Sequence, residues 1–256
     1  MRQTFAILAA LLLVAACNDD STGPTATLTA EQRADVAAAM GEATSSDLDA
    51  MSRSGTSASV LFGFGGALDN GVCTPVLGNL VCTATAGTVS GEATLKFRDG
   101  SGTPQTAYDA STTASVLIDT DVAAEVSRSG FTLDYHHEGS FTVTGLAGAE
   151  TTRTWTGTGS TSVTSASFGG TRTYELTTAT NFQAVVVATD GADPRWPNSG
   201  RVTSNVQLDI TGGTHDGEQY TTTVQIDFNG TANVPMLVGG APFMLDLSTH
   251  AVTSGS

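Results

Sequence analysis

The sequence predicts an all-β protein, either an antiparallel sandwich or a strongly curved meander sheet, with a short helix near the N-terminus. Beyond residue 60, apolar and polar residues alternate with a period of two almost to the C-terminus. The alternating segments are rich in Thr and are separated by Gly, Asn and Asp, which is typical of antiparallel sheets with one solvated face. Helical features are confined to residues 29–51.

The first 16 residues have the organisation of a signal peptide. Arg2 forms a short basic region, and an apolar stretch follows from Phe5 to Ala16. This stretch is shorter than the roughly 20 residues that a membrane-spanning helix needs. We therefore expect residues 1–16 to direct export and to be removed.

The signal segment ends in Val14-Ala15-Ala16-Cys17. This ending resembles the lipobox of bacterial lipoproteins, in which a Cys after small residues is acylated, for example with palmitate, and becomes the new N-terminus. The resemblance implies that Cys17 carries a lipid anchor in the cell envelope. In that family an Asp directly after the Cys can signal retention in the inner membrane. Here Asp19 stands one position later, which favours the outer membrane.

Residues 17–28 are polar, acidic and rich in turn formers, and we expect a flexible tether. Residues 29–51 follow as a short helical segment. Thr29 and Gln32 match a capping box at its start. We expect the helix to break near Gly41, with a further turn from Ser46 to Met51. Val36 and Met40 would form its buried stripe.

Once Cys17 is acylated, Cys73 and Cys82 remain as a pair in an oxidising compartment, and a disulfide is expected. The segment between them would fold back as a hairpin. A metal site made from these two thiols alone would lack ligands, because no His lies nearby in the sequence.

Residues 58–256 are expected to form the β-domain. The clearest strand runs from Phe131 to Val143, with Gly139 as a possible bulge. Two further strands are predicted around Val202–Ile210 and Tyr220–Phe228, joined by a hairpin loop. Less distinct strands are expected near Val60–Phe64, Val72–Pro75, Val81–Ala84, Ala93–Phe97, Ala114–Ile118, Arg153–Gly157, Thr171–Thr177, Phe182–Val187 and Phe243–Leu247.

The turn after Phe228 can be predicted from side-chain parity. A two-residue Asn229-Gly230 turn would direct Thr231, Asn233 and Pro235 into the core. A three-residue loop that ends at Thr231 would instead direct Val234, Met236 and Val238 inward. We therefore predict a loop with an odd number of residues, or a bulge.

One strand face carries possible metal ligands. Asp134, His136 and Glu138 share a parity, and an oxygen–nitrogen–oxygen set can bind a divalent ion. The alternative is the solvated face of an amphipathic strand, and no metal or cofactor is required by the sequence. His137 points the other way. Asp119-Thr120-Asp121 is expected to be an acidic loop whose oxygen ligands would suit Ca²⁺. It lacks the spacing of an EF-hand loop, and turn chemistry is the alternative explanation for such loops.

Trp196 lies in a loop between two prolines, where it could contact a ligand such as a glycan or fill the end of the fold. The formal net charge is −15, and Lys96 is the only lysine. Such a chain repels nucleic acid and anionic lipid head groups. The sequence contains no Gly-x-Ser-x-Gly elbow, Walker loop or His-Glu-x-x-His motif, so no catalytic residue is assigned.

These features favour a non-enzymatic cell-envelope lipoprotein, a structural or binding module joined to the membrane by its lipid anchor. Its partner could be a glycan, a lipid or an envelope protein. A second hypothesis is a carrier whose curved sheet encloses an apolar ligand. That cavity would be lined by inward residues such as Phe131, Leu133, Tyr135, Val224, Ile226 and Phe228. A third is a hydrolase with an unrecognised site.

Overall fold

The structure is a computed structural model, and it describes residues 27–52, 72–86, 88–128, 131–148, 150–168, 172–189, 196–211 and 215–255. The expected signal peptide, Cys17 and most of the expected tether lie outside the described residues. The strand expected near Val60–Phe64 also lies outside them. For Phe131 and Tyr135 the backbone is described but the side chains are not.

The described residues contain one helix and thirteen strands of a single antiparallel sheet. The helix α1 spans Ala30–Ser52. The strands are β1 (Val72–Val76), β2 (Asn79–Ala86), β3 (Val89–Asp99), β4 (Pro104–Gln105), β5 (Thr113–Arg128), β6 (Phe131–Thr144), β7 (Thr152–Phe168), β8 (Arg172–Ala188), β9 (Ser199–Thr211), β10 (Gln219–Asp227), β11 (Asn233–Val238), β12 (Ala241–Asp246) and β13 (Ala251–Ser254).

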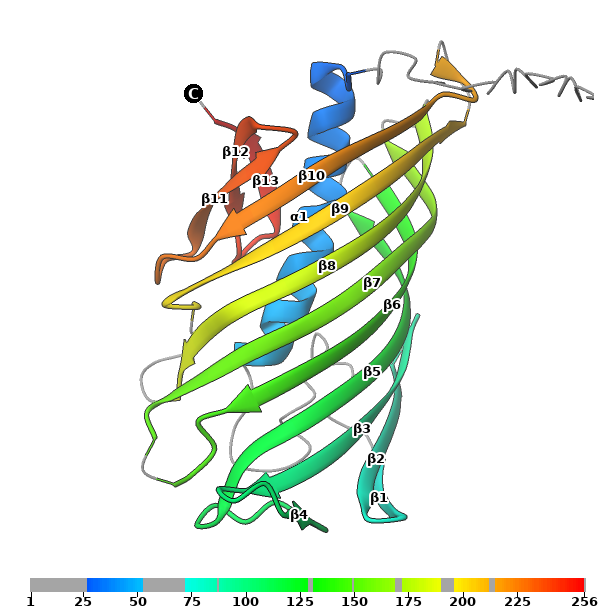
Figure 1. Cartoon of the computed structure of the whole chain (residues 1–256). Coiled ribbons are helices and arrows are strands. Elements are labelled where there is room, and N and C mark those ends of the chain that lie inside the picture. The colour runs from blue at the N-terminus through cyan, green and yellow to red at the C-terminus, as the bar shows by residue number, and fades with distance from the viewer. Residues whose placement is uncertain are drawn as a thin grey trace, which may run out of the picture.

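The sheet is a curved meander and not a sandwich of two sheets. Twelve of the strands follow one another in sequence order from β1 at one edge to β13 at the other, and β4 pairs only with β3. Figure 1 shows the long central strands crossing the molecule obliquely and curving around α1, which lies on the concave side. Of the two predicted architectures, the strongly curved meander is therefore the one observed.

The capping box predicted at the start of α1 is present. The backbone N–H of Gln32 donates to Oγ1 of Thr29 at 3.1 Å, and the N–H of Thr29 donates to Oε1 of Gln32 at 2.8 Å. Val36 and Met40 are buried as predicted. These interactions satisfy backbone donors that the first helical turn leaves without a partner.

The break predicted near Gly41 is wrong, because α1 continues without interruption to Ser52. Gly41 lies where the helix meets the C-terminal strands. A Cβ atom at this position would lie 2.7 Å from Cγ2 of Val252 and 3.1 Å from Cδ1 of Leu245. The glycine therefore permits a close approach of helix and sheet, and it does not end the helix.

One hydrophobic core lies between the concave face of the sheet and α1. The helix contacts β7, β8, β11, β12 and β13. Phe141 is in edge-on contact with both Phe182 and Trp155, with ring centroids 5.1 and 6.2 Å apart. The core thus joins the central strands to one another beneath the helix.

Two local predictions on the strands have different outcomes. Val234, Met236 and Val238 are all fully buried, as the odd-loop argument requires, and Ile226 pairs with Met236. The bulge suggested at Gly139 is wrong, since Gly139 pairs in regular register with both Thr120 and Gly159. A Cβ atom at Gly139 would come within 2.4 Å of the Phe141 ring, so this glycine makes room for Phe141.

Candidate functional site

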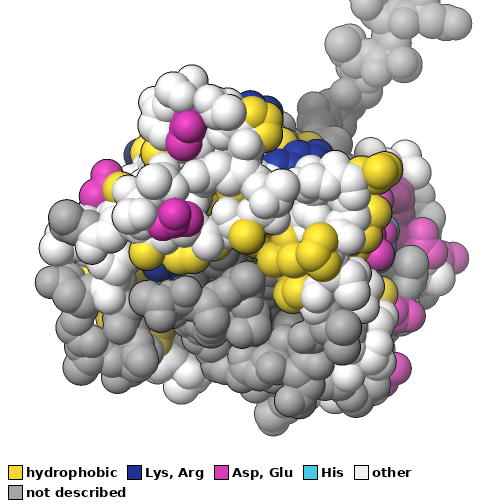
Figure 2. Space-filling view, turned by 90° about the horizontal axis from the view of Figure 1, so that it is seen from below, with side chains coloured by type: hydrophobic (Ala, Val, Ile, Leu, Met, Phe, Trp, Pro, Cys, Tyr) yellow, Lys and Arg dark blue, Asp and Glu magenta, His cyan; other side chains and the backbone are white. Residues whose placement is uncertain are grey.

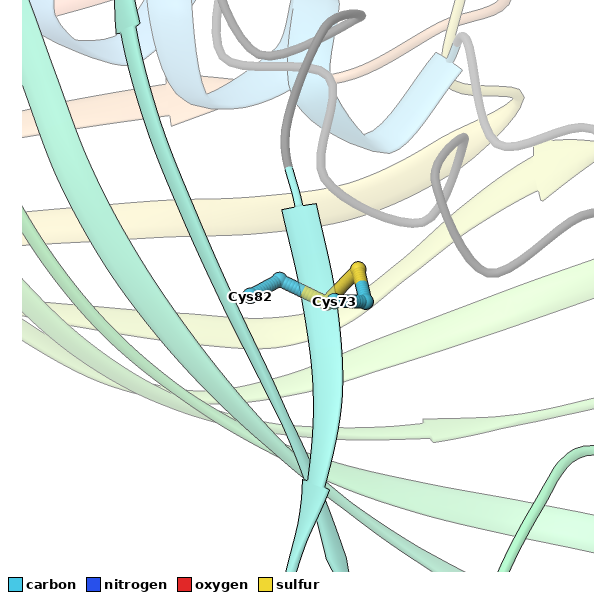
Figure 3. Close-up of a disulfide and its surroundings, with 2 residues drawn as sticks. All are labelled: Cys73 and Cys82. Atoms are coloured by element: carbon cyan, nitrogen blue, oxygen red, sulfur yellow. A yellow bond between two sulfur atoms is a disulfide. The ribbon is translucent and has the colours of Figure 1, made fainter.

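The hairpin of β1 and β2 contains the expected disulfide. Cys73 and Cys82 are direct cross-strand partners with their Cα atoms 4.0 Å apart, and their sulfurs are bonded. Figure 3 shows the bridge joining the two neighbouring strands. Cys82 is buried while Cys73 is only half-buried. The cross-link therefore ties the first strand of the sheet to the core.

The turn of this hairpin exposes an apolar side chain. Leu77 and Gly78 form a two-residue connection with φ angles of 49° and 83°, the positive values that a type I′ turn requires at both positions. Leu77 is 99% exposed, and Val76 beside it is 45% exposed. Figure 2, which views the end of the molecule where this turn lies in Figure 1, shows hydrophobic side chains gathered on the surface.

The outer face of the sheet brings together acidic and imidazole side chains from β5 and β6. Asp121 is the direct cross-strand partner of Glu138, and His136 follows on the same face. Nε2 of His136 lies 2.7 Å from Oδ1 of Asp121. One potential ligand atom from each of Asp121, His136 and Glu138 lies within 4.8 Å of the others. Of the predicted ligand residues, His136 and Glu138 belong to this group and Asp134 does not.

From the sequence, Asp121 was considered only as a Ca²⁺ ligand of an acidic loop, Asp119-Thr120-Asp121, and not together with His136 and Glu138. The structure places these residues within β5. Asp119 accepts hydrogen bonds from Lys96 and Ser140, both at 2.8 Å. Burial opposes ionisation of Asp119, but these hydrogen bonds and the charge of Lys96 outweigh it and lower its pKa. The single lysine is therefore already paired with Asp119.

The concave face is occupied by α1, which buries carboxylates there. The hydroxyl of Tyr174 donates to Oδ2 of Asp35 at 2.6 Å. Farther along the helix, Oε2 of Glu42 lies 3.1 Å from Nδ1 of His250. A helix that buries several acidic residues beside polar partners differs from the apolar stripe expected from Val36 and Met40 alone.

Asp47 forms the third polar contact, with His137 of β6. Its Oδ1 atom lies 3.5 Å from Nε2 of His137, without the geometry of a hydrogen bond. Burial raises the pKa of Asp47, and the nearby charge of His137 acts in the opposite direction. Nδ1 of His137 is 2.9 Å from Oγ1 of Thr161 on β7. His137 thus points into the interior, as its parity predicts, where it links two strands and the helix.

The apolar residues that a carrier would use are part of the filled core. Leu133, Val224, Ile226 and Phe228 are all buried. Trp196 is half-buried and packs against the same core. A hollow of about 460 Å³ lies near Leu28, Arg33 and Thr222, and its lining is largely polar. Ligand contact by Trp196 remains a prediction.

No family model matches this sequence, no curated protein matches it, and no solved structure matches its fold. Among the described residues, no helix is long and apolar enough to cross a membrane.

Proposed function

We propose that this chain is a lipid-anchored protein of the bacterial cell envelope, held at the outer membrane by an acylated Cys17, and that its β-domain binds a partner protein. The ending Ala15-Ala16-Cys17 and the polar segment after it support the anchor. The Cys73–Cys82 disulfide supports an oxidising compartment, because such bonds persist mainly in exported proteins.

The main support for a binding role is the exposed Leu77 at the tip of the β1–β2 hairpin, which the Cys73–Cys82 disulfide cross-links. Type I′ turns favour Asn-Gly, and a left-handed conformation costs an ordinary L-residue roughly 1–2 kcal/mol. Leu77 adopts this conformation while its side chain is 99% exposed. An apolar side chain on a cross-linked hairpin is suited to filling a pocket in a partner, because little conformational freedom is lost on binding.

The position of the hairpin favours a partner away from the anchoring membrane. Figure 1 places the start of α1 and the β1–β2 turn at opposite ends of the molecule. The described residues begin at Thr27, next to the start of α1, so the hairpin lies at the end of the molecule away from the point where the N-terminal segment attaches. The carrier hypothesis would require α1 to leave the concave face, and surface binding requires no such rearrangement.

Acylation is tested by expressing the chain in bacteria fed a labelled fatty acid. The wild type should incorporate the label, and its mature form should begin at Cys17. Cys17→Ser should lose the label and the membrane association. A mature chain that begins upstream of Cys17, or that carries no acyl group, would refute the anchor.

Partner binding is tested with a photoreactive amino acid at position 77, in cells of the source organism. A discrete cross-linked protein is expected from position 77. The matched control is position 237, because Leu237 is also apolar and exposed (38%) but lies on β11. Leu77→Asn keeps a turn-compatible residue and should abolish co-purification of the cross-linked protein. Equal cross-linking from both positions, or unchanged co-purification with Leu77→Asn, would contradict the proposal.

A further inference from the structure

We propose that Asp121, His136 and Glu138 form a binding site for a divalent transition-metal ion, with Zn²⁺ as the preferred ion. This inference does not depend on the lipid anchor or on partner binding through the hairpin. It begins from the antiparallel register of β5 and β6, which pairs Asp121 directly with Glu138 and places His136 two residues along the same face.

The distances suit a shared ion. Nε2 of His136 lies 2.7 Å from Oδ1 of Asp121, and one ligand atom from each of the three residues lies within 4.8 Å of the others. Zinc ligands sit about 2.0–2.2 Å from the ion, so small rotations of the side chains would bring all three atoms around one centre. Such rotations are available because the side chains of His136 and Asp121 are 43% and 63% exposed.

The type of ligand selects the ion. Ca²⁺ and Mg²⁺ bind mainly to oxygen, whereas an imidazole nitrogen beside carboxylates favours Zn²⁺ and similar transition metals. Three protein ligands would leave at least one coordination position for water or another ligand. The site would therefore be open, unlike a closed structural zinc site.

The surroundings leave that open position accessible. Next to Glu138 the outer face has a shallow hollow of about 310 Å³, lined by Glu138, Gly139, Ser140, Thr158, Gly159 and Ser160. Apart from Glu138, the lining residues have small side chains or none, since they are two glycines, two serines and a threonine. A metal bound at Glu138 could thus exchange water from this side.

The charges near the site also favour a cation. The chain has a formal net charge of −15, which raises the local concentration of cations. Its single lysine, Lys96, pairs with the neighbouring Asp119 at 2.8 Å. Among the described residues, no Lys or Arg forms an ion pair with Asp121 or Glu138, so a metal would not have to displace one.

Titration calorimetry of the full mature chain in detergent, after removal of metal with a chelator, tests the site with Zn²⁺ alone. We expect one ion to bind per chain. His136→Gln, Asp121→Asn and Glu138→Gln should each weaken Zn²⁺ binding at least about tenfold. Mutating a residue that only orients a metal ligand already costs about that much affinity, and a ligand itself should cost no less. Since all three residues lie on the outer face, their substitution should leave the urea unfolding midpoint near that of the wild type.

Matched controls come from carboxylates on the same strands. Glu125→Gln on β5 and Asp134→Asn on β6 should leave the Zn²⁺ affinity unchanged within error. Co²⁺ provides a spectroscopic readout of the same site. Bound to the wild type, it should give a visible absorption spectrum typical of low-coordinate nitrogen and oxygen ligands. His136→Gln should lose this spectrum. The proposal is overturned if the wild type binds no Zn²⁺, or if the controls weaken binding as much as the three site variants do.

Discussion

The phenol of Tyr174 on β8 donates a 2.6 Å hydrogen bond to the carboxylate of Asp35 on α1, and both residues are buried. The bond joins residues that are 139 positions apart in the chain. Because buried polar groups require partners in defined places, contacts of this kind restrict how α1 can sit against the sheet. Glu42 with His250 and Asp47 with His137 add two further contacts along the helix.

Tyr174→Phe should destabilise the fold by about 1–3 kcal/mol, because it removes a hydrogen bond to a buried carboxylate. The measurement is the free energy of unfolding in urea. Tyr108→Phe is the control, since the Tyr108 hydroxyl donates a longer 3.2 Å bond to the Leu146 carbonyl and is only half-buried. An equal or larger loss in the control would show that the Asp35 contact does not orient the helix.

Gly41→Ala should also destabilise the protein, although Ala favours helices. The higher propensity of Ala would contribute about 1 kcal/mol in an open helix, but overpacking costs about 1–3 kcal/mol. The added methyl would lie 2.7 Å from Val252 and 3.1 Å from Leu245. Urea unfolding measures the net loss.

A double variant separates the clash from helix propensity. Val252→Ala removes the methyl group nearest to position 41, so Gly41→Ala should be less harmful in that background. At the exposed helix position 34, Ala34→Gly should show the ordinary propensity loss alone. If Gly41→Ala proves stabilising, the close packing of helix and sheet at this point is refuted.

Gly41 also illustrates why part of the fold could not be predicted from sequence. A glycine near the middle of a helical pattern is a reasonable place to end the helix. The reason for this glycine lies in Leu245 and Val252, about two hundred residues later, and no local pattern reveals their proximity. The polar partners of Asp35, Glu42 and Asp47 were missed for the same reason.

Side-chain parity predicted the C-terminal strands correctly. The three-residue loop proposed from Asn229 to Thr231 is shorter than the observed connection from Phe228 to Ala232. Val234 and Met236 are nevertheless buried, because any odd loop length gives the same inward set. Parity thus determines the face of a residue without determining its exact cross-strand partner.

The position of Asp121 within a strand was missed, although the sequence contains a signal for it. Val116 and Ile118 share a parity with Val122, Ala124 and Val126, so the alternation continues through the acidic residues. Extending the strand accordingly would have placed Asp119 and Asp121 on the outer face. Their pairing with β6 still depends on the register, which the sequence did not provide.

Reduction of the Cys73–Cys82 disulfide should loosen the first hairpin more than the rest of the sheet. The bridge closes a short loop, with a sequence separation of nine residues, and a loop of that size is worth up to about 3 kcal/mol. Limited proteolysis with and without a reductant should show faster cleavage around Leu77 in the reduced protein. In the double variant Cys73→Ser/Cys82→Ser, cleavage should be fast in both conditions. If the reductant also speeds cleavage of that variant, the faster cleavage of the wild type is not due to loss of the Cys73–Cys82 disulfide.

Asp47 should make stability depend on pH in an unusual direction. Burial raises its pKa above the ordinary value of 3.8, so the folded protein holds this proton more tightly than the unfolded chain does. The contribution of this group is therefore favourable at low pH and is lost as the pH rises through the raised pKa. Asp47→Asn removes the titration, so its stability relative to the wild type should increase as the pH rises above 3.8. Urea unfolding across an acid-to-neutral pH series measures this difference.

Asp246 provides a control, because its contribution to stability should depend on pH in the opposite direction. Hydrogen bonds from the hydroxyl and backbone N–H of Ser248 lower the pKa of Asp246 below 3.8. Its stabilising contribution is present above that value and is lost as the pH falls through the lowered pKa. Asp246→Asn should therefore lose stability relative to the wild type at neutral pH and less so in acid. Parallel pH profiles for wild type and Asp47→Asn would mean that Asp47 is not buried beside His137 in solution.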